Sequence, residues 1–141
     1  MHPVPTANNI DDVTAFLEVF NAPGFELVVE ECRMEESVDA DGIPYTEIGS
    51  TVYSKEVITF FDLAQKPCWI DTEYLEKKAH TMVEQKGSIR TASLDEIRTL
   101  LTYCSRGERF CDGFWVDIFE RRVIHAILER LLEIRKSDFT D

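Results

Sequence analysis

The sequence has few of the residues that build disulfide frameworks and metal centres, and it has no long apolar run. Its 141 residues include three histidines and four cysteines, and no two cysteines form a CxxC pair. Cys104, Cys111 and His125 do not match a recognised zinc spacing, so we predict neither a metal site nor a cofactor. No apolar run reaches the roughly 18 residues that cross a bilayer, and residues 1–9 do not resemble a signal peptide. We therefore expect a cytoplasmic protein with reduced thiols and no membrane association.

Sequence motifs of common enzyme classes are also missing. The chain has no phosphate-cradling glycine loop, no HExxH and no GxSxG. The stretch Asp39-Ala40-Asp41-Gly42 resembles part of a calcium loop. With Gly42 at the sixth position, however, the twelfth is Ile48, where calcium needs a bidentate acid. We interpret the stretch as an acidic turn between strands, and whether the protein is an enzyme stays open.

Basic residues are scarce in the first third of the chain. Residues 1–54 contain eleven acids and one base, Arg33, a net of −10, whereas residues 55–141 contain 16 acids and 14 bases, a net of −2. The negative charge of residues 1–54 repels phosphate groups, so it disfavours nucleic acids and anionic membranes as partners. It fits a basic protein partner, a cation or a solvated acidic surface.

Glycine and proline number only six and five, and 44% of the residues are hydrophobic, which favours a folded chain. The length suits one domain. We predict a flexible lead at 1–8, a single globular domain at 9–136 and a frayed tail at 137–141. The fold class is mainly α with a minor β part: four to five packed helices and a small β-hairpin in the N-terminal third.

Local signals place these elements. Asn9 is the expected N-cap of a helix that ends near Asn21, and Ser54 of one that ends near Lys66. Alternation predicts strands within 25–34 and 45–53, joined by an acidic loop at 35–44. Asp71 or Thr72 is expected to cap a third helix, with Leu75 in its apolar stripe and Gly87 as its stop.

The last third carries the strongest helical pattern. Ser93 and Glu96 form a capping box for a helix that should run to about Ser105. A charged connector follows, and from Phe114 the pattern predicts either one long helix or two that meet near 120–122. The apolar stripe of 123–132 is wide, which predicts packing against the Ser93 helix or homodimerisation through the C-terminal helix.

The segment 106–115 gathers two arginines, two acids and three aromatic residues. Arg106 and Arg109 could hold a carboxylate or phosphate by forked hydrogen bonds, with Asp112 and Trp115 beside them. The same residues also suit a purely structural role, because Phe110 and Trp115 would anchor the connector in the core. Arg106, Arg109, Asp112 and Trp115 are thus our candidate ligand-binding residues, and both interpretations stay open.

This segment carries a family resemblance. The letters LTYCSRGERFCDGFW, followed by VIHAILERL, resemble a bacterial family of small domains of unknown function. Its pattern of an arginine, an Arg-Phe pair and an acid-Gly pair before the last helix corresponds here to Arg106, Arg109-Phe110 and Asp112-Gly113. The family often has a glycine before that helix, where this chain has Arg121-Arg122. The resemblance implies a largely helical domain of bacterial or phage origin and no particular activity.

Two hypotheses about function follow. The first is a non-catalytic interaction or regulatory module, based on the acidic first third and the missing catalytic motifs. The second is a small-molecule-binding protein or enzyme that holds an anionic ligand with the arginines of 106–115.

Overall fold

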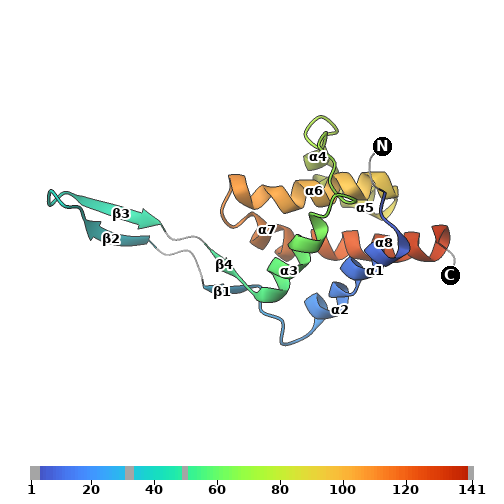
Figure 1. The fold of residues 1–141 in the computed structure, drawn as a ribbon, viewed down its shortest axis with the longest axis horizontal. Helices are drawn as coiled ribbons and strands as arrows, with labels where there is room; N and C mark the ends of the chain where they lie inside the picture. Colours follow the sequence, from blue (N-terminus) through green and yellow to red (C-terminus); the bar gives the residue numbers. More distant parts are fainter. Residues whose placement is uncertain (1–3, 31–33, 49–50, 140–141) are drawn as a thin grey trace.

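The computed structural model describes residues 4–30, 34–48 and 51–139, which form a body of packed helices and a projecting two-stranded arm (Figure 1). The helices are α1 (Ala7–Thr14), α2 (Phe16–Asn21), α3 (Lys55–Ala64), α4 (Ala79–Glu84), α5 (Lys86–Arg90), α6 (Leu94–Phe110), α7 (Phe114–Glu120) and α8 (Val123–Asp138). The strands are β1 (Val28–Glu30), β2 (Met34–Val38), β3 (Pro44–Ile48) and β4 (Val52–Tyr53). The mainly α class with a minor β part is confirmed. Within these ranges no helix has the length and apolar character that would let it span a membrane.

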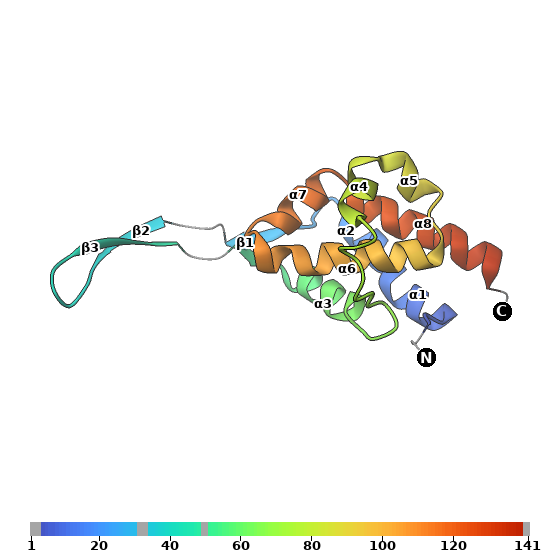
Figure 2. The same ribbon diagram turned by 90° about the horizontal axis from the view of Figure 1, so that it is seen from above.

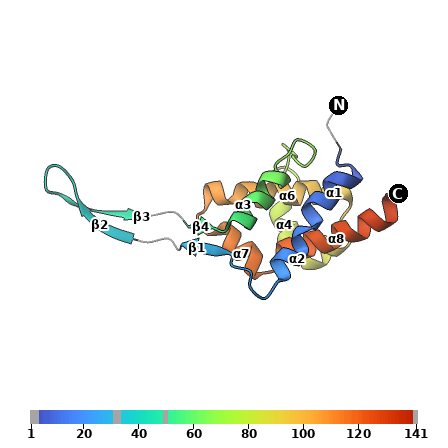
Figure 3. The same cartoon turned by 60° about the horizontal axis from the view of Figure 1, so that its bottom comes forward.

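Helix α8 is central to the body. It contacts α1, α2, α5, α6 and α7, and Figure 3 shows α1 and α2 beside it. Its side chains Ile124, Ile127, Leu128 and Leu131 are completely buried within the single chain. The two helices predicted for the back half, α6 and α8, are therefore confirmed. Because the chain itself covers the stripe of α8, the apolar face that motivated homodimerisation is already used, and dimerisation stays a prediction.

Capping explains where two helices begin. Ser93 and Glu96 exchange side-chain-to-backbone hydrogen bonds of 3.2 and 3.1 Å, so the predicted capping box of α6 is confirmed. The prediction of Asn9 as a cap was wrong: Thr6 caps α1, and Asn9 is its capping-box partner three residues later. The end of α6 also differs from the prediction, because the helix continues through the supposed connector to Phe110.

The helix predicted from Asp71 or Thr72 does not form there. Residues 72–78 make turns, and α4 begins only at Ala79. Lys78 has a left-handed backbone with φ of 57°, which interrupts a right-handed helix. Leu75 is 72% exposed, so its assignment to an apolar stripe was wrong. The carboxylate of Asp71 accepts bonds from this segment and from α6, which stabilises the turns instead.

The last third contains two helices rather than one. Helix α7 ends at Glu120, and α8 begins at Val123 after Arg122, whose φ is 58°. This left-handed residue breaks the helix without glycine or proline. The helices α7 and α8 then contact each other and α6.

The strands form two separate antiparallel pairs, which we together call the ribbon. β1 pairs with β4 next to the helical body, and β2 pairs with β3 farther out. We call residues 34–48 the arm; it extends away from the body, opposite the end where α1 begins and α8 finishes (Figure 2). The predicted hairpin is thus confirmed, but β2 occupies the start of the predicted loop, so the connecting turn is shorter than expected.

Candidate functional site

The four candidate ligand-binding residues lie around the turn between α6 and α7. Arg106 and Arg109 are one turn apart on α6, and the Arg106 guanidinium carbon lies 5.4 Å from the centre of the Tyr74 ring, a cation–π contact. Arg109 is exposed and makes no hydrogen bond or ion pair with any residue that the structure describes. The ligand-binding role of the four residues stays a prediction.

Asp112 and Trp115 hold the ribbon against the body. The carboxylate of Asp112 accepts hydrogen bonds from the Thr51 backbone N–H at 3.1 Å and the Thr51 hydroxyl at 2.8 Å. The Trp115 ring stacks on Phe61 at 4.0 Å between centroids and lies 5.0 Å from Tyr53. The structural interpretation of Trp115 is therefore supported. In contrast, Phe110 is 80% exposed and does not anchor the connector.

Glu108 is a third attachment point, which the sequence did not reveal. Its carboxylate accepts hydrogen bonds from the Tyr53 hydroxyl at 2.8 Å and from the backbone N–H groups of Gly113 and Trp115 at 2.9 Å each. It therefore caps the start of α7 from the preceding helix and holds β4 at the same time. Burial and then the Glu108 carboxylate raise the pKa of Tyr53, so its hydroxyl remains a donor. No capping motif has this spacing, because the contact depends on the turn between the helices.

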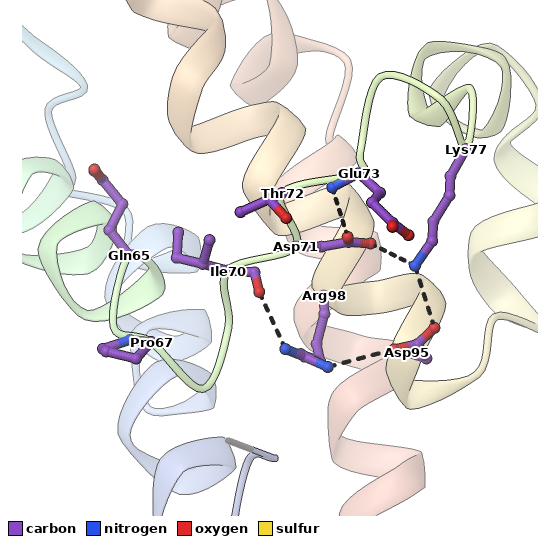
Figure 4. A pocket seen from close by; sticks show the side chains of 9 residues that line it. All are labelled: Gln65, Pro67, Ile70, Asp71, Thr72, Glu73, Lys77, Asp95 and Arg98. Carbon is purple, nitrogen blue, oxygen red and sulfur yellow. Dashed lines mark hydrogen bonds and ion pairs between the residues drawn. The ribbon is translucent and has the colours of Figure 1, made fainter. Parts of the chain in front are cut away.

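A polar cavity of about 470 Å³ lies between the segment before α4 and the start of α6. Figure 4 shows Asp71 and Lys77 reaching toward each other above Asp95 and Arg98, which project from α6. The Lys77 Nζ lies 2.8 Å from Asp71 and 3.6 Å from Asp95. Arg98 donates to the Ile70 carbonyl at 3.1 Å.

The polar side chains around this cavity attach one segment of the chain to another. Burial raises the pKa of Asp71, but hydrogen bonds from Lys77, Thr99 and the Glu73 backbone outweigh it and leave the pKa below its ordinary value. The pKa of Lys77 is raised, mainly by its hydrogen bond to Asp71. An ionised carboxylate held by three donors is a poor base, and its bonds attach residues 71–77 to α6.

The cysteines differ in exposure. Cys68 and Cys104 are buried, and burial raises the pKa of both thiols, that of Cys104 to about 12. Neither is therefore a ready nucleophile. Cys111 is exposed, and Cys32 lies outside the described residues. In the described part of the chain, no three His, Cys, Asp or Glu residues gather where they could hold a metal ion.

The tip of the arm is a well-ordered acidic turn, as predicted. The Asp39 carboxylate accepts hydrogen bonds from the backbone N–H groups of Asp41 and Ile43, both at 2.9 Å. The Asp39 N–H also donates to the Ile43 carbonyl at 3.1 Å. Gly42 has a φ of 80°, a backbone conformation that residues with a side chain rarely adopt. The turn is thus fixed by the Asp39 carboxylate and by a backbone hydrogen bond.

The arm exposes both apolar and acidic side chains. Val38 is 64% exposed, Ile43 59% and Tyr45 43%. Glu36, Asp39 and Asp41 are also exposed, and residues 34–48 include no lysine, arginine or histidine. The arm therefore combines exposed apolar side chains with a purely negative charge.

Comparison with known proteins gives one match. Neither the curated proteins nor the solved structures include a match to this chain. A family model matches residues 5–137, which is nearly the whole chain and includes the arm, the helical body and the turn between α6 and α7. The resemblance seen in the last third of the sequence is consistent with that match. The chain belongs to the family described as "Family of unknown function (DUF6508)".

Proposed function

We propose that this protein is a non-catalytic interaction module whose arm binds a basic, partly apolar surface of another protein. The observation that carries the proposal is that the arm stands clear of the helical body (Figure 1, Figure 2) with Val38, Ile43 and Tyr45 exposed. A two-stranded hairpin is only marginally stable in water by itself. Exposed apolar side chains on such an element are typical of a binding surface.

The charge of the arm favours a basic partner. The five acids of residues 34–48 have no cation beside them in the sequence, and three of them are described as exposed. Complementary positive charge on a partner would speed association and favour the correct orientation. Both outer edges of a two-stranded ribbon also have unpaired backbone groups, so a partner strand could extend it.

The tip of the arm and the part of the ribbon next to the body are both organised before binding. Next to the body, Thr51 donates hydrogen bonds to Asp112 and Tyr53 donates one to Glu108. At the tip, Asp39 fixes the turn. A preorganised element loses less conformational entropy on binding, which favours affinity. We further propose that the module acts in the cytoplasm of a bacterial cell, where buried, unpaired thiols such as Cys68 and Cys104 stay reduced.

Site-specific crosslinking tests this proposal. A photoreactive amino acid is placed at Ile43 in the arm and, as a matched control, at Ile58, a 45% exposed isoleucine on α3. Adducts formed in the native host are identified by mass spectrometry, and the partner is then purified. We expect Ile43→Ser and Asp41→Lys to weaken binding of the purified partner by about tenfold or more in calorimetry, whereas Ile58→Ser leaves it unchanged.

Three results would count against the proposal. One is the same set of adducts from both positions, and another is a purified partner that binds the Ile43→Ser variant as tightly as the native protein. The third is a partner surface that is acidic. Circular dichroism of each variant shows whether the helical body is intact, so lost binding is not confused with lost folding.

A further inference from the structure

A second concave surface lies on the helical body, between α5 and α8. Arg90, Arg121, Arg122 and Arg130 line it, and its volume is about 460 Å³. Two glutamates, Glu129 and Glu133, also line it, which leaves a net charge of +2 with His125 neutral. Four arginines therefore meet in one small cavity of a chain whose net charge is −12.

The four arginines differ in how many hydrogen bonds and ion pairs they already make within the protein. Arg90 is exposed and has no hydrogen bond or ion pair within the described residues. Arg122 donates one hydrogen bond, to the Asn21 side chain at 3.0 Å. Each guanidinium has five N–H donors. Most donors of these two side chains remain available to a ligand.

The other two arginines are held in place by the protein. Arg130 donates from Nε to the Ala92 carbonyl at 2.8 Å and lies 3.5 Å from Glu133. Arg121 pairs with Asp117 at 3.1 Å and with Glu84 at 3.3 Å. These contacts fix two guanidinium groups at the wall of the cavity, which is the preorganisation that recognition of an anion requires.

The floor of the cavity contains a buried histidine. The side chain of His125 is almost fully buried, with 5% of the residue exposed, and its Nδ1 has no hydrogen-bond partner. The centres of the Phe20 and Phe119 rings lie 6.4 and 6.1 Å from the centre of the His125 ring. An unsatisfied buried polar atom costs free energy in the unliganded protein.

The backbone of Arg122 gives a further reason. Its φ of 58° is unfavourable for any residue with a side chain, by about 1–2 kcal/mol. Glycine would adopt this conformation without that cost. Strained residues of this kind gather at functional sites, where the side chain offsets the strain.

We propose that the cavity between α5 and α8 binds a small phosphorylated molecule, whose phosphoryl group is held by Arg90 and Arg122 with Arg121 and Arg130 beside them. Planar guanidinium forks match the oxygens of a phosphoryl group. The volume is in the range of small-molecule sites, about 300–1,000 Å³. A long polyanion such as nucleic acid would meet the negative field of the remaining surface, so the site selects a small ligand.

Isothermal titration calorimetry with pyrophosphate at low salt tests the inference. We expect saturable binding at one site, and Arg90→Gln and Arg122→Gly should each weaken it by about tenfold or more, the loss typical of one charge-assisted hydrogen bond. Lys66→Gln is the matched control, because Lys66 is also an exposed basic residue whose side chain has no hydrogen bond or ion pair within the described residues, but it lies after α3, outside this cavity. It should bind pyrophosphate like the native protein.

Several outcomes would overturn the proposal. The native protein could fail to bind pyrophosphate, or Lys66→Gln could lose binding as strongly as Arg90→Gln. Saturable binding of citrate without binding of pyrophosphate would replace the phosphoryl group by a carboxylate, and binding of duplex DNA alone would exclude a small ligand. Arg90 has no hydrogen bond or ion pair within the described residues, so its variant keeps the test valid if Arg122→Gly changes stability.

Discussion

Replacement of Gly107 by alanine tests the packing at the turn between α6 and α7. A Cβ built at this position would overlap Cδ1 and Cε1 of the Phe114 ring and lie 2.7 Å from its Cγ. These atoms are too close for a real contact, so the ring would have to move. Phe114 also packs edge-on against Tyr103 at 5.4 Å between centroids. The perturbation therefore reaches both helices and the aromatic contact between them.

The expected size follows from three opposing effects. Alanine gains about 1 kcal/mol over glycine in a helix interior. Overpacking costs about 1–3 kcal/mol, and loss of the aromatic pair costs a further 0.5–1.5 kcal/mol or so. The net expectation is a loss of about 2 kcal/mol in the free energy of unfolding of the Gly107→Ala variant. Urea unfolding followed by circular dichroism and by tryptophan fluorescence measures it.

Gly87 provides the matched control. It lies in α5, and a Cβ there meets no atom within 4 Å. Gly87→Ala should therefore stabilise the protein by up to about 1 kcal/mol. In a Phe114→Ala background, Gly107→Ala should also become neutral or stabilising, because the overlapping ring is gone. If Gly107→Ala stabilises the native background as much as Gly87→Ala does, the packing argument is refuted.

Three further predictions concern single side chains. Arg122→Gly should raise the free energy of unfolding by about 0.5–1 kcal/mol, because glycine adopts the left-handed backbone without strain. Arg121→Gly should lower the free energy of unfolding, because the φ of Arg121 is an ordinary −78°. Urea unfolding of the two variants compares these effects. Glu108→Gln should cost about 2 kcal/mol by weakening the bond to Tyr53 and the cap of α7, and equal stability would contradict that role. Burial and Arg122 lower the pKa of His125 below 6.5, so the unfolded chain binds the proton more readily and stability should fall below about pH 6.5. That part of the pH dependence should vanish in His125→Gln, and an unchanged profile would disprove it.

The helices that the sequence predicted well are those with complete local signals. The capping box at Ser93 and the stripe of α8 are both read from neighbouring residues, and tertiary packing agrees with them. The helix expected from Thr72 failed because the carboxylate of Asp71 is bound by Thr99 of a distant segment. A sequence pattern cannot show that competition, since the partner lies 28 residues away.

The candidate site was predicted only in part, for the same reason. The sequence singled out the segment 106–115, whose ligand-binding role stays a prediction; its clearest contacts, those of Asp112 and Trp115, attach the ribbon to the body. The cavity between α5 and α8 was missed entirely. Its arginines come from separate elements, and neither Arg90 nor Arg130 lies within a recognisable motif. Only the folded chain brings them together.

The distribution of charge links the arm and the cavity. Like charges placed together repel, so stability alone favours interspersed signs. Yet the arm holds five acids and no base, and the cavity collects four of the chain's fifteen basic residues. Elsewhere, the described surface contains ordinary pairs such as Arg135 with Asp11 at 3.1 Å and Arg98 with Asp95 at 3.4 Å. The purely negative charge of the arm and the net positive charge of the cavity both oppose stability, and they are the charges that the two proposed surfaces, one for a basic protein and one for a small anion, would need.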